Sequence, residues 1–116
     1  MLFGTIMVCR IVMRKLEVFV SLYPGKSKEF KQSLLDISKK LREYSSSFII
    51  DELDDALSFN IFIQWKTSEQ MHLAFKREEF KILSGAINSL CEKKIIRLDN
   101  KQLGNHISLF NSIYQA

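Results

Sequence analysis

The chain has 116 residues, of which 47% are hydrophobic, and contains one proline, four glycines and no low-complexity tract or internal repeat. This composition predicts one globular domain over residues 1–116 and excludes a fibrous or disordered protein. The net charge of +4 comes from basic residues interleaved with acidic ones, without a nucleic-acid-binding motif, so we expect a solvated surface and no nucleic-acid partner.

The N-terminal residues 1–13 form an apolar run that Arg10 interrupts, and neither a basic segment nor a small-residue cleavage site flanks it. The run is also shorter than the roughly 20 residues that span a bilayer. We therefore expect no membrane partner and a cytoplasmic location.

The two cysteines, Cys9 and Cys91, lack the CxxC spacing of zinc and redox sites. A free cysteine is most often a buried core residue, so both are expected to be reduced and buried. His106 has no second ligand near it in the sequence, and a single histidine makes no metal site. No bound metal is therefore expected.

The first half of the chain predicts a strand, a turn and a helix. Residues 6–23 are rich in β-branched and aromatic side chains, and alternate apolar residues share one face: Leu16, Val18, Val20 and Leu22. Pro24 and Gly25 form a turn, after which Ser27 can cap a helix over residues 27–44. The apolar face of this helix repeats at helical spacing through Phe30, Leu34, Ile37 and Leu41.

The second half predicts a hairpin, a divided helical region and a last strand. Residues 48–53 and 57–65 form the hairpin around an acidic turn at Asp54 and Asp55. In its second strand, Phe59, Ile61, Ile63 and Trp65 lie on one face and Ser58, Asn60, Phe62 and Gln64 on the other. Thr67 and Gln70 have capping-box spacing, and the charged residues 76–79 divide the helical region that follows. Residues 95–98 form a short fourth strand.

This βαββαβ order predicts an α+β, ferredoxin-like fold with an antiparallel sheet and its helices on one face. The strands carry large apolar side chains on both faces, for example Val18 beside Phe19 and Ile61 beside Phe62. An apolar sheet face left open to water is a liability that a symmetric partner covers. A homodimer is therefore expected.

Several motifs resemble those of the antibiotic biosynthesis monooxygenase family. The match consists of Trp65-Lys66-Thr67-Ser68-Glu69-Gln70-Met71, then Phe80, Gly85-Ala86 and Leu90, preceded by the Pro24-Gly25-Lys26 turn and Glu29-Phe30. The family has a strand-ending tryptophan, a Thr/Ser-x-Glu helix start and a Phe-x4-Gly-Ala-x3-Leu pattern. The resemblance covers residues 14–98 and leaves an N-terminal extension, 1–13, and a C-terminal tail, 100–116, outside it.

The resemblance implies a dimeric α/β-barrel with a small-molecule pocket between the helices and the sheet of each subunit. Family members include cofactor-free oxygenases of quinol-like aromatics, haem-degrading enzymes and proteins without established activity. The histidine and asparagine of the haem-degrading members are replaced here by Ala74 and Val18, which argues against haem and leaves no cofactor expected.

Six residues are candidates for the site that the resemblance implies. Trp65 is the first candidate pocket residue, because an indole offers a stacking face and one N–H donor, although a core tryptophan is an equally good interpretation. His72 is a weak candidate for a catalytic base, since histidine titrates near neutral pH, but most such residues simply lie on a helix surface. Phe75 and Phe80 are core residues first and pocket walls second, and Tyr23, like Tyr44, is a weak candidate donor.

Two functions stay open at this level. The first is a cofactor-independent monooxygenase acting on a small hydroxylated, quinol-like aromatic, and the second is a dimeric small-molecule-binding or stress-related module without turnover. An open cavity with His72 or a tyrosine pointing inward favours the enzyme. A pocket closed by Leu34, Ile63, Phe75 and Leu83 favours the binding module.

Overall fold

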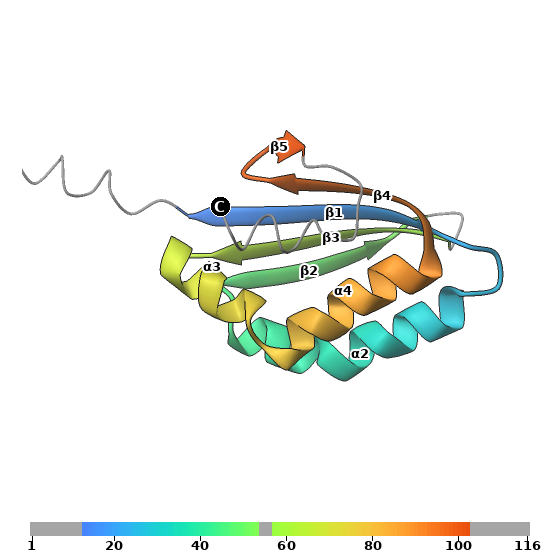
Figure 1. Ribbon diagram of the computed structural model, residues 1–116, viewed down its shortest axis with the longest axis horizontal. Helices are drawn as coiled ribbons and strands as arrows, with labels where there is room; N and C mark the ends of the chain where they lie inside the picture. The colour runs from blue at the N-terminus through green and yellow to red at the C-terminus, as the bar shows by residue number, and fades with distance from the viewer. Residues whose placement is uncertain (1–12, 54–56, 103–116) are drawn as a thin grey trace, which may run out of the picture.

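The computed structural model describes residues 13–53 and 57–102 (Figure 1). Its elements are β1 (Arg14–Leu22), α2 (Ser27–Glu43), β2 (Ser47–Glu52), β3 (Ser58–Trp65), α3 (Ser68–Phe75), α4 (Glu78–Leu90), β4 (Cys91–Leu98) and β5 (Lys101–Gln102). The predicted βαββαβ order is confirmed, and the second helical region is divided as expected. Cys9, the turn at Asp54 and Asp55, and the tail from residue 103, with His106, lie outside the described residues.

The strands form one antiparallel sheet in the order β2-β3-β1-β4-β5. β1 is central, with Arg14 opposite Trp65 of β3 and Val18 opposite Ile96 of β4. The helices all lie against one face of the sheet (Figure 1), which confirms the predicted ferredoxin-like fold. None of the described helices is long and apolar enough to cross a membrane.

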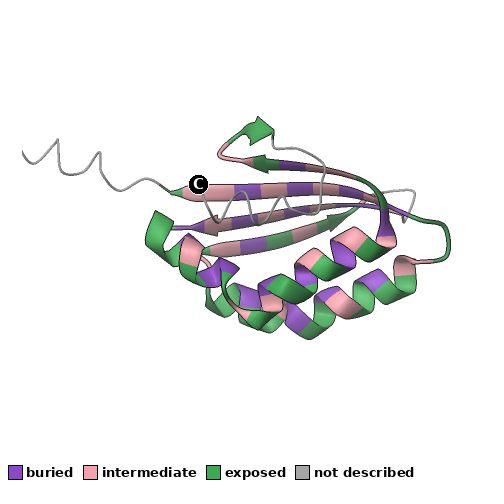
Figure 2. Ribbon diagram, viewed as in Figure 1, coloured by how far each residue is buried: buried purple, intermediate pink, exposed green. Residues whose placement is uncertain are grey.

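The core lies between this face and the helices, where buried positions alternate along β1 and β3 (Figure 2). The predicted inward residues are all buried: Leu16, Val18, Val20 and Leu22 from β1, and Phe30, Leu34, Ile37 and Leu41 from α2. The period of two in the strand and the helical spacing in α2 therefore point apolar side chains at one another, as expected for a two-layer domain.

The ends of the elements differ in part from expectation. Thr67 accepts a hydrogen bond from the backbone N–H of Gln70 at 3.1 Å, which confirms the predicted cap of α3. The Ser27 prediction is wrong by one residue, because the cap position of α2 is Lys26, whose side chain makes no capping bond. The chain enters α2 through Gly25, whose φ of +83° is a conformation that glycine adopts without strain.

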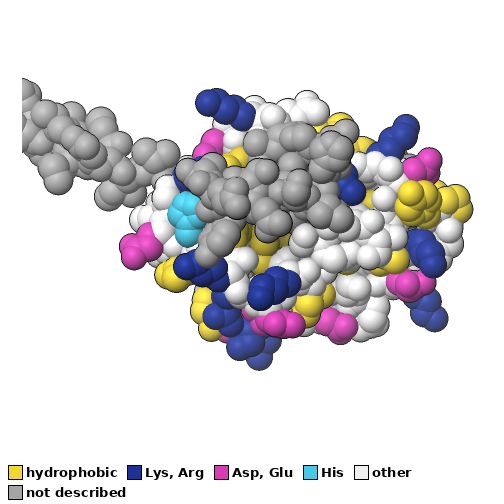
Figure 3. Space-filling view, in the orientation of Figure 1, with side chains coloured by type: hydrophobic (Ala, Val, Ile, Leu, Met, Phe, Trp, Pro, Cys, Tyr) yellow, Lys and Arg dark blue, Asp and Glu magenta, His cyan; other side chains and the backbone are white. Residues whose placement is uncertain are grey.

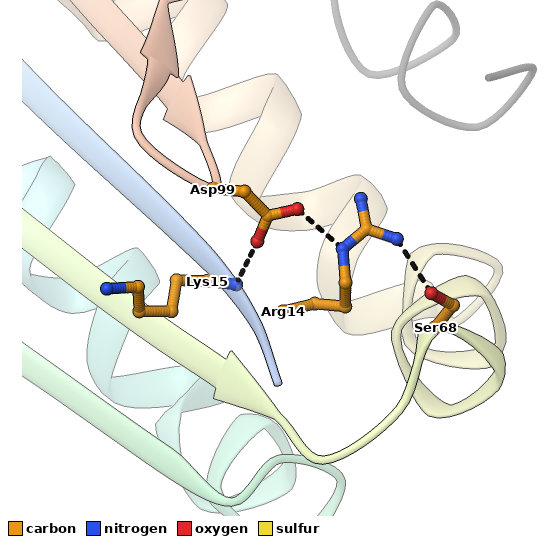
Figure 4. Close-up of polar contacts among 4 residues, drawn as sticks. All are labelled: Arg14, Lys15, Ser68 and Asp99. Atoms are coloured by element: carbon orange, nitrogen blue, oxygen red, sulfur yellow. Dashed lines mark hydrogen bonds and ion pairs between the residues drawn. The ribbon is translucent and has the colours of Figure 1, made fainter. Parts of the chain in front are cut away.

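The last strand is longer than predicted and is followed by β5, which falls in the predicted tail. A two-residue turn joins them, with positive φ at Asp99 (53°) and Asn100 (72°), the residue types that tolerate the left-handed region. The Asp99 carboxylate accepts hydrogen bonds from Arg14 Nε at 2.6 Å and from the Lys15 backbone N–H at 2.9 Å (Figure 4). Arg14 also donates to Ser68 Oγ at 2.8 Å, so its side chain links this turn to the start of α3.

The face of the sheet away from the helices carries apolar side chains in its middle. The register places Ile49 of β2 beside Phe62 of β3, and Phe19 of β1 beside Ile95 of β4. Ile49 is 50% exposed, the other three are half-buried, and no described helix covers them. This apolar area is the one that the sequence predicted on the second face of the strands.

Candidate functional site

An aromatic cluster lies where β3 ends and the helices return over the sheet. Trp65 is 1% exposed and meets Phe75 edge-on at 5.5 Å between ring centroids and Phe80 at 6.4 Å. Phe75 ends α3 and Phe80 lies in the first turns of α4, and their centroids are 4.5 Å apart. The break between the two helices thus brings both rings onto the indole.

The Trp65 indole N–H is buried and has no hydrogen-bond partner among the described residues. A buried donor without a partner costs on the order of 1–3 kcal/mol, so most native structures pair it. The indole therefore offers one unused donor inside an apolar cluster. A hydrogen bond from this N–H to a polar atom of a ligand would be stronger than the same hydrogen bond in water, because the dielectric constant of the cluster is low.

The other sequence candidates divide between two ends of the sheet. His72 is half-buried on α3 and meets Phe75 edge-on at 6.4 Å, at the margin of the cluster. Tyr23 is 46% exposed just after β1, where its backbone N–H donates to the carbonyl of Leu90. Because β1 starts opposite Trp65 and runs nine residues away from it, Tyr23 lies roughly 30 Å from the indole along the sheet. The structure brings Trp65, His72, Phe75 and Phe80 together and leaves Tyr23 apart.

The space between helices and sheet is filled in the described part of the chain. The four side chains that were expected to close the pocket are all buried: Leu34 (4% exposed), Ile63 (1%), Phe75 (8%) and Leu83 (0%). Their burial continues the core from α2 to the aromatic cluster. This interior is the closed pocket that favours a binding module, and not the open cavity that favours an enzyme.

A hollow of about 650 Å³ opens on the surface beside this cluster. It lies between the end of α2, the start of α3 and the link from α3 to α4, and is lined by Glu43, Tyr44, Ser45, Ser46, Lys66, Gln70, Leu73, Ala74 and Arg77. Lys66 follows Trp65 in the chain and Ala74 precedes Phe75, so the hollow opens beside the aromatic cluster, although none of the three rings is part of its lining.

The walls of the hollow are held by specific contacts. The Arg77 guanidinium lies over the Tyr44 ring, with 3.5 Å between its central carbon and the ring centroid, and its Nε donates to Glu79 at 3.1 Å. On the other side, the Gln70 side-chain oxygen accepts from the Lys66 backbone N–H at 3.2 Å. Apart from Tyr44, these residues were not candidates from the sequence, because the charge of Arg77 and Lys66 is typical of any solvated helix end.

Cys91 is buried at the start of β4, and burial raises the pKa of its thiol from 9.0 to about 12, against the smaller opposing effect of Lys94. The thiol is therefore neutral at physiological pH, which suits a core residue better than a nucleophile. Among the described residues, no three His, Cys, Asp or Glu side chains come together in a way that could hold a metal ion.

Comparison with known proteins shows what the chain is similar to. No protein-family model and no curated protein matches the sequence. A solved structure from Nitrosomonas europaea, whose name is putative antibiotic biosynthesis monooxygenase, superimposes with a TM-score of 0.68 at 13% identity, covering 76% of this chain and 88% of that one. A structure of the same name from Caulobacter crescentus gives 0.67 at 13% identity, with 78% and 90% covered.

A conserved protein of unknown function from Bacteroides thetaiotaomicron superimposes with a TM-score of 0.64 at 18% identity, covering 78% of this chain and 97% of that one. At such identities the likeness shows the fold alone. The chain therefore has the ferredoxin-like fold of structures named antibiotic biosynthesis monooxygenase, as its motifs predicted.

Proposed function

We propose that the protein is a cytoplasmic, dimeric small-molecule-binding protein whose ligand, a small hydroxylated aromatic, occupies the hollow beside Trp65. One observation carries the proposal: the 650 Å³ hollow opens on Lys66 and Ala74, the chain neighbours of Trp65 and Phe75, while the interior is filled. The buried thiol of Cys91 fits a reducing compartment.

The size and lining of the hollow suit such a ligand. Small-molecule pockets have volumes of about 300–1,000 Å³ and combine apolar walls with a few polar groups that fix orientation. Here Leu73 and Ala74 supply aliphatic surface, Tyr44 an aromatic ring, and Gln70 an amide. Leu73 is 58% exposed, so a ligand that covered it would remove apolar surface from water.

A second copy of the chain is the proposed cover for the open sheet face. Phe19, Ile49, Phe62 and Ile95 lie together there without a helix over them in the described part of the chain. Two such faces packed about a two-fold axis would bury each other's apolar centre. The hollow lies on the helix side and stays accessible in that arrangement.

Ligand binding can be measured through Trp65, because it is the only tryptophan in the chain. Titration with 1,4-naphthohydroquinone under nitrogen should change the Trp65 emission saturably, with the same Kd by calorimetry. Tyr44→Ala, which removes a ring from the hollow, should weaken binding about tenfold, and Leu35→Ala, on the exposed side of α2, should not change it. Equal binding by Tyr44→Ala would move the site away from the hollow.

Cofactor-independent oxygenation is the second candidate function, favoured by the unpartnered Trp65 N–H and by the monooxygenase names of the fold neighbours. A phenol-type substrate would give up its hydroxyl proton, with His72 as the proposed base, and Trp65 would donate to the resulting oxyanion. One atom of O₂ then becomes a new ring carbonyl, and the other leaves as water with two substrate hydrogens. The substrate supplies all four electrons, and Phe75 and Phe80 wall the site.

Oxygen uptake by metal-free protein with 1-naphthol and anthrone tests this reaction. Turnover above the autoxidation background should fall at least tenfold in both His72→Gln and Trp65→Phe, whereas Tyr23→Phe, at the far end of the sheet, should retain full activity. Binding without uptake would leave the protein as a binding module. Uptake that both variants retain would place the chemistry outside the cluster.

A further inference from the structure

The charges around the hollow are unbalanced. Lys66 and Arg77 contribute two cations to its lining, and Glu43 contributes the single acid. Glu43 lies 3.7 Å from the ammonium of Lys40, on its own helix. None of the ion pairs between described residues includes Lys66, which is exposed. Arg77 is paired with Glu79 at 3.1 Å, so the uncompensated positive charge of the hollow is that of Lys66.

Arg77 is oriented by two contacts that leave part of its guanidinium unused. Its face lies on the Tyr44 ring at 3.5 Å, and Glu79 accepts only from Nε, at 3.1 Å. A guanidinium carries five N–H donors, so the two terminal amino groups keep theirs, and no residue in the described ranges accepts from them. The stacking on Tyr44 fixes the plane of these donors before any ligand arrives, which reduces the entropy lost on binding.

We infer that the hollow selects an aromatic carboxylate, in which the carboxylate binds between Lys66 and Arg77 and the ring packs on Leu73 and the edge of Tyr44. The inference rests on the proposed ligand site and adds the charge of the ligand. A carboxylate matches the fork of guanidinium donors, and the Lys66 ammonium supplies the second charge. A hydroxyl group on the ring would hydrogen-bond with the Gln70 amide or the Tyr44 hydroxyl, which line the same hollow.

The contact between Arg77 and Tyr44 also joins the end of α2 to the link between α3 and α4, so a variant of Arg77 can change stability as well as binding. Lys66 offers the cleaner variant, because its ammonium makes no ion pair within the described residues and its contact with Gln70 comes from the backbone N–H, which a substitution keeps. Comparison of the two variants therefore separates an effect on binding of the charged ligand from an effect on folding.

Calorimetry with 2-naphthoate and its neutral isostere 2-naphthamide tests the inference at low salt. The wild type should bind the carboxylate about tenfold more tightly than the amide. Lys66→Gln should weaken naphthoate about threefold and Arg77→Gln about tenfold, with the affinity for the amide unchanged in Lys66→Gln. Lys39→Gln removes an exposed lysine of α2 outside the hollow and should leave both affinities unchanged. Thermal melting checks that each variant is folded.

The outcomes separate this inference from the proposed function. Equal affinity for the carboxylate and the amide, both lost in Tyr44→Ala, would keep the hollow as a ligand site and overturn its preference for an anion. No binding of either compound or of naphthohydroquinone would remove the ligand site itself. A tenfold preference that survives in both Lys66→Gln and Arg77→Gln would also overturn the inference, because other groups would then hold the carboxylate.

Discussion

Trp65→Ala should lower the free energy of unfolding by about 3–5 kcal/mol, the range for removing a large buried aromatic side chain. Trp65 is 1% exposed and packs against Phe75 and Phe80, which are themselves 8% and 2% exposed. Removal of the indole leaves a cavity that two rings from different helices would have to fill. Because Phe75 ends α3 and Phe80 belongs to α4, that adjustment would strain the link between the helices.

Urea unfolding followed by circular dichroism measures this loss, since the variant has no tryptophan fluorescence. Trp65→Phe keeps a ring and removes the unpartnered N–H, so its loss should be below about 2 kcal/mol. Leu35→Ala, at a position 69% exposed, should stay within about 0.5 kcal/mol of the wild type. A loss below about 1 kcal/mol in Trp65→Ala would mean that the indole borders an open, hydrated cavity, contrary to the filled interior.

The sequence predicted those parts of the molecule that depend on local periodicity. Alternation in β3 placed Trp65 on the face of Ile63, because successive side chains of a strand point to opposite faces. The spacing of Thr67 and Gln70 predicted the start of α3, because the bond from the Gln70 N–H to Thr67 lies within one turn of helix. The Gln70 side chain accepts from the Lys66 N–H and not from that of Thr67. Both features are decided by residues fewer than five positions apart.

The hollow could not be predicted in this way. Tyr44 and Arg77 lie 33 positions apart in the sequence, and their stacking follows from where α2 ends relative to the helix break. The same limit applies to the contact of Arg14 with Asp99, which joins residues 85 positions apart. The same holds for Tyr23, a weak candidate donor from its residue type, because antiparallel pairing of β1 with β3 puts it at the other end of the sheet from Trp65.

Phe19→Lys should convert a dimer in solution into a monomer, if the open sheet face is the subunit interface. Phe19 lies on the central strand between Asn60 of β3 and Ile95 of β4, so it occupies the middle of that face. A two-fold axis would bring two introduced ammonium groups into one apolar contact, and each would have to lose its hydration without a carboxylate partner. Asn60 and Ile95, directly opposite it, are uncharged, and the flanking residues of this face carry both signs, with Glu17 on β1 and Lys93 and Arg97 on β4.

Sedimentation velocity across a wide range of protein concentration measures this change. Leu35→Lys is the matched control, because it adds the same charge on the helix side of the molecule at a residue 69% exposed, and it should remain a dimer. A wild type that sediments as a monomer throughout would refute the proposed interface outright. A Phe19→Lys protein that stays dimeric would place the contact on another surface, and Phe19, Ile49, Phe62 and Ile95 would then need a different cover. Naphthohydroquinone binding should persist in the monomer, since the hollow lies on the helix side and draws its lining from one subunit.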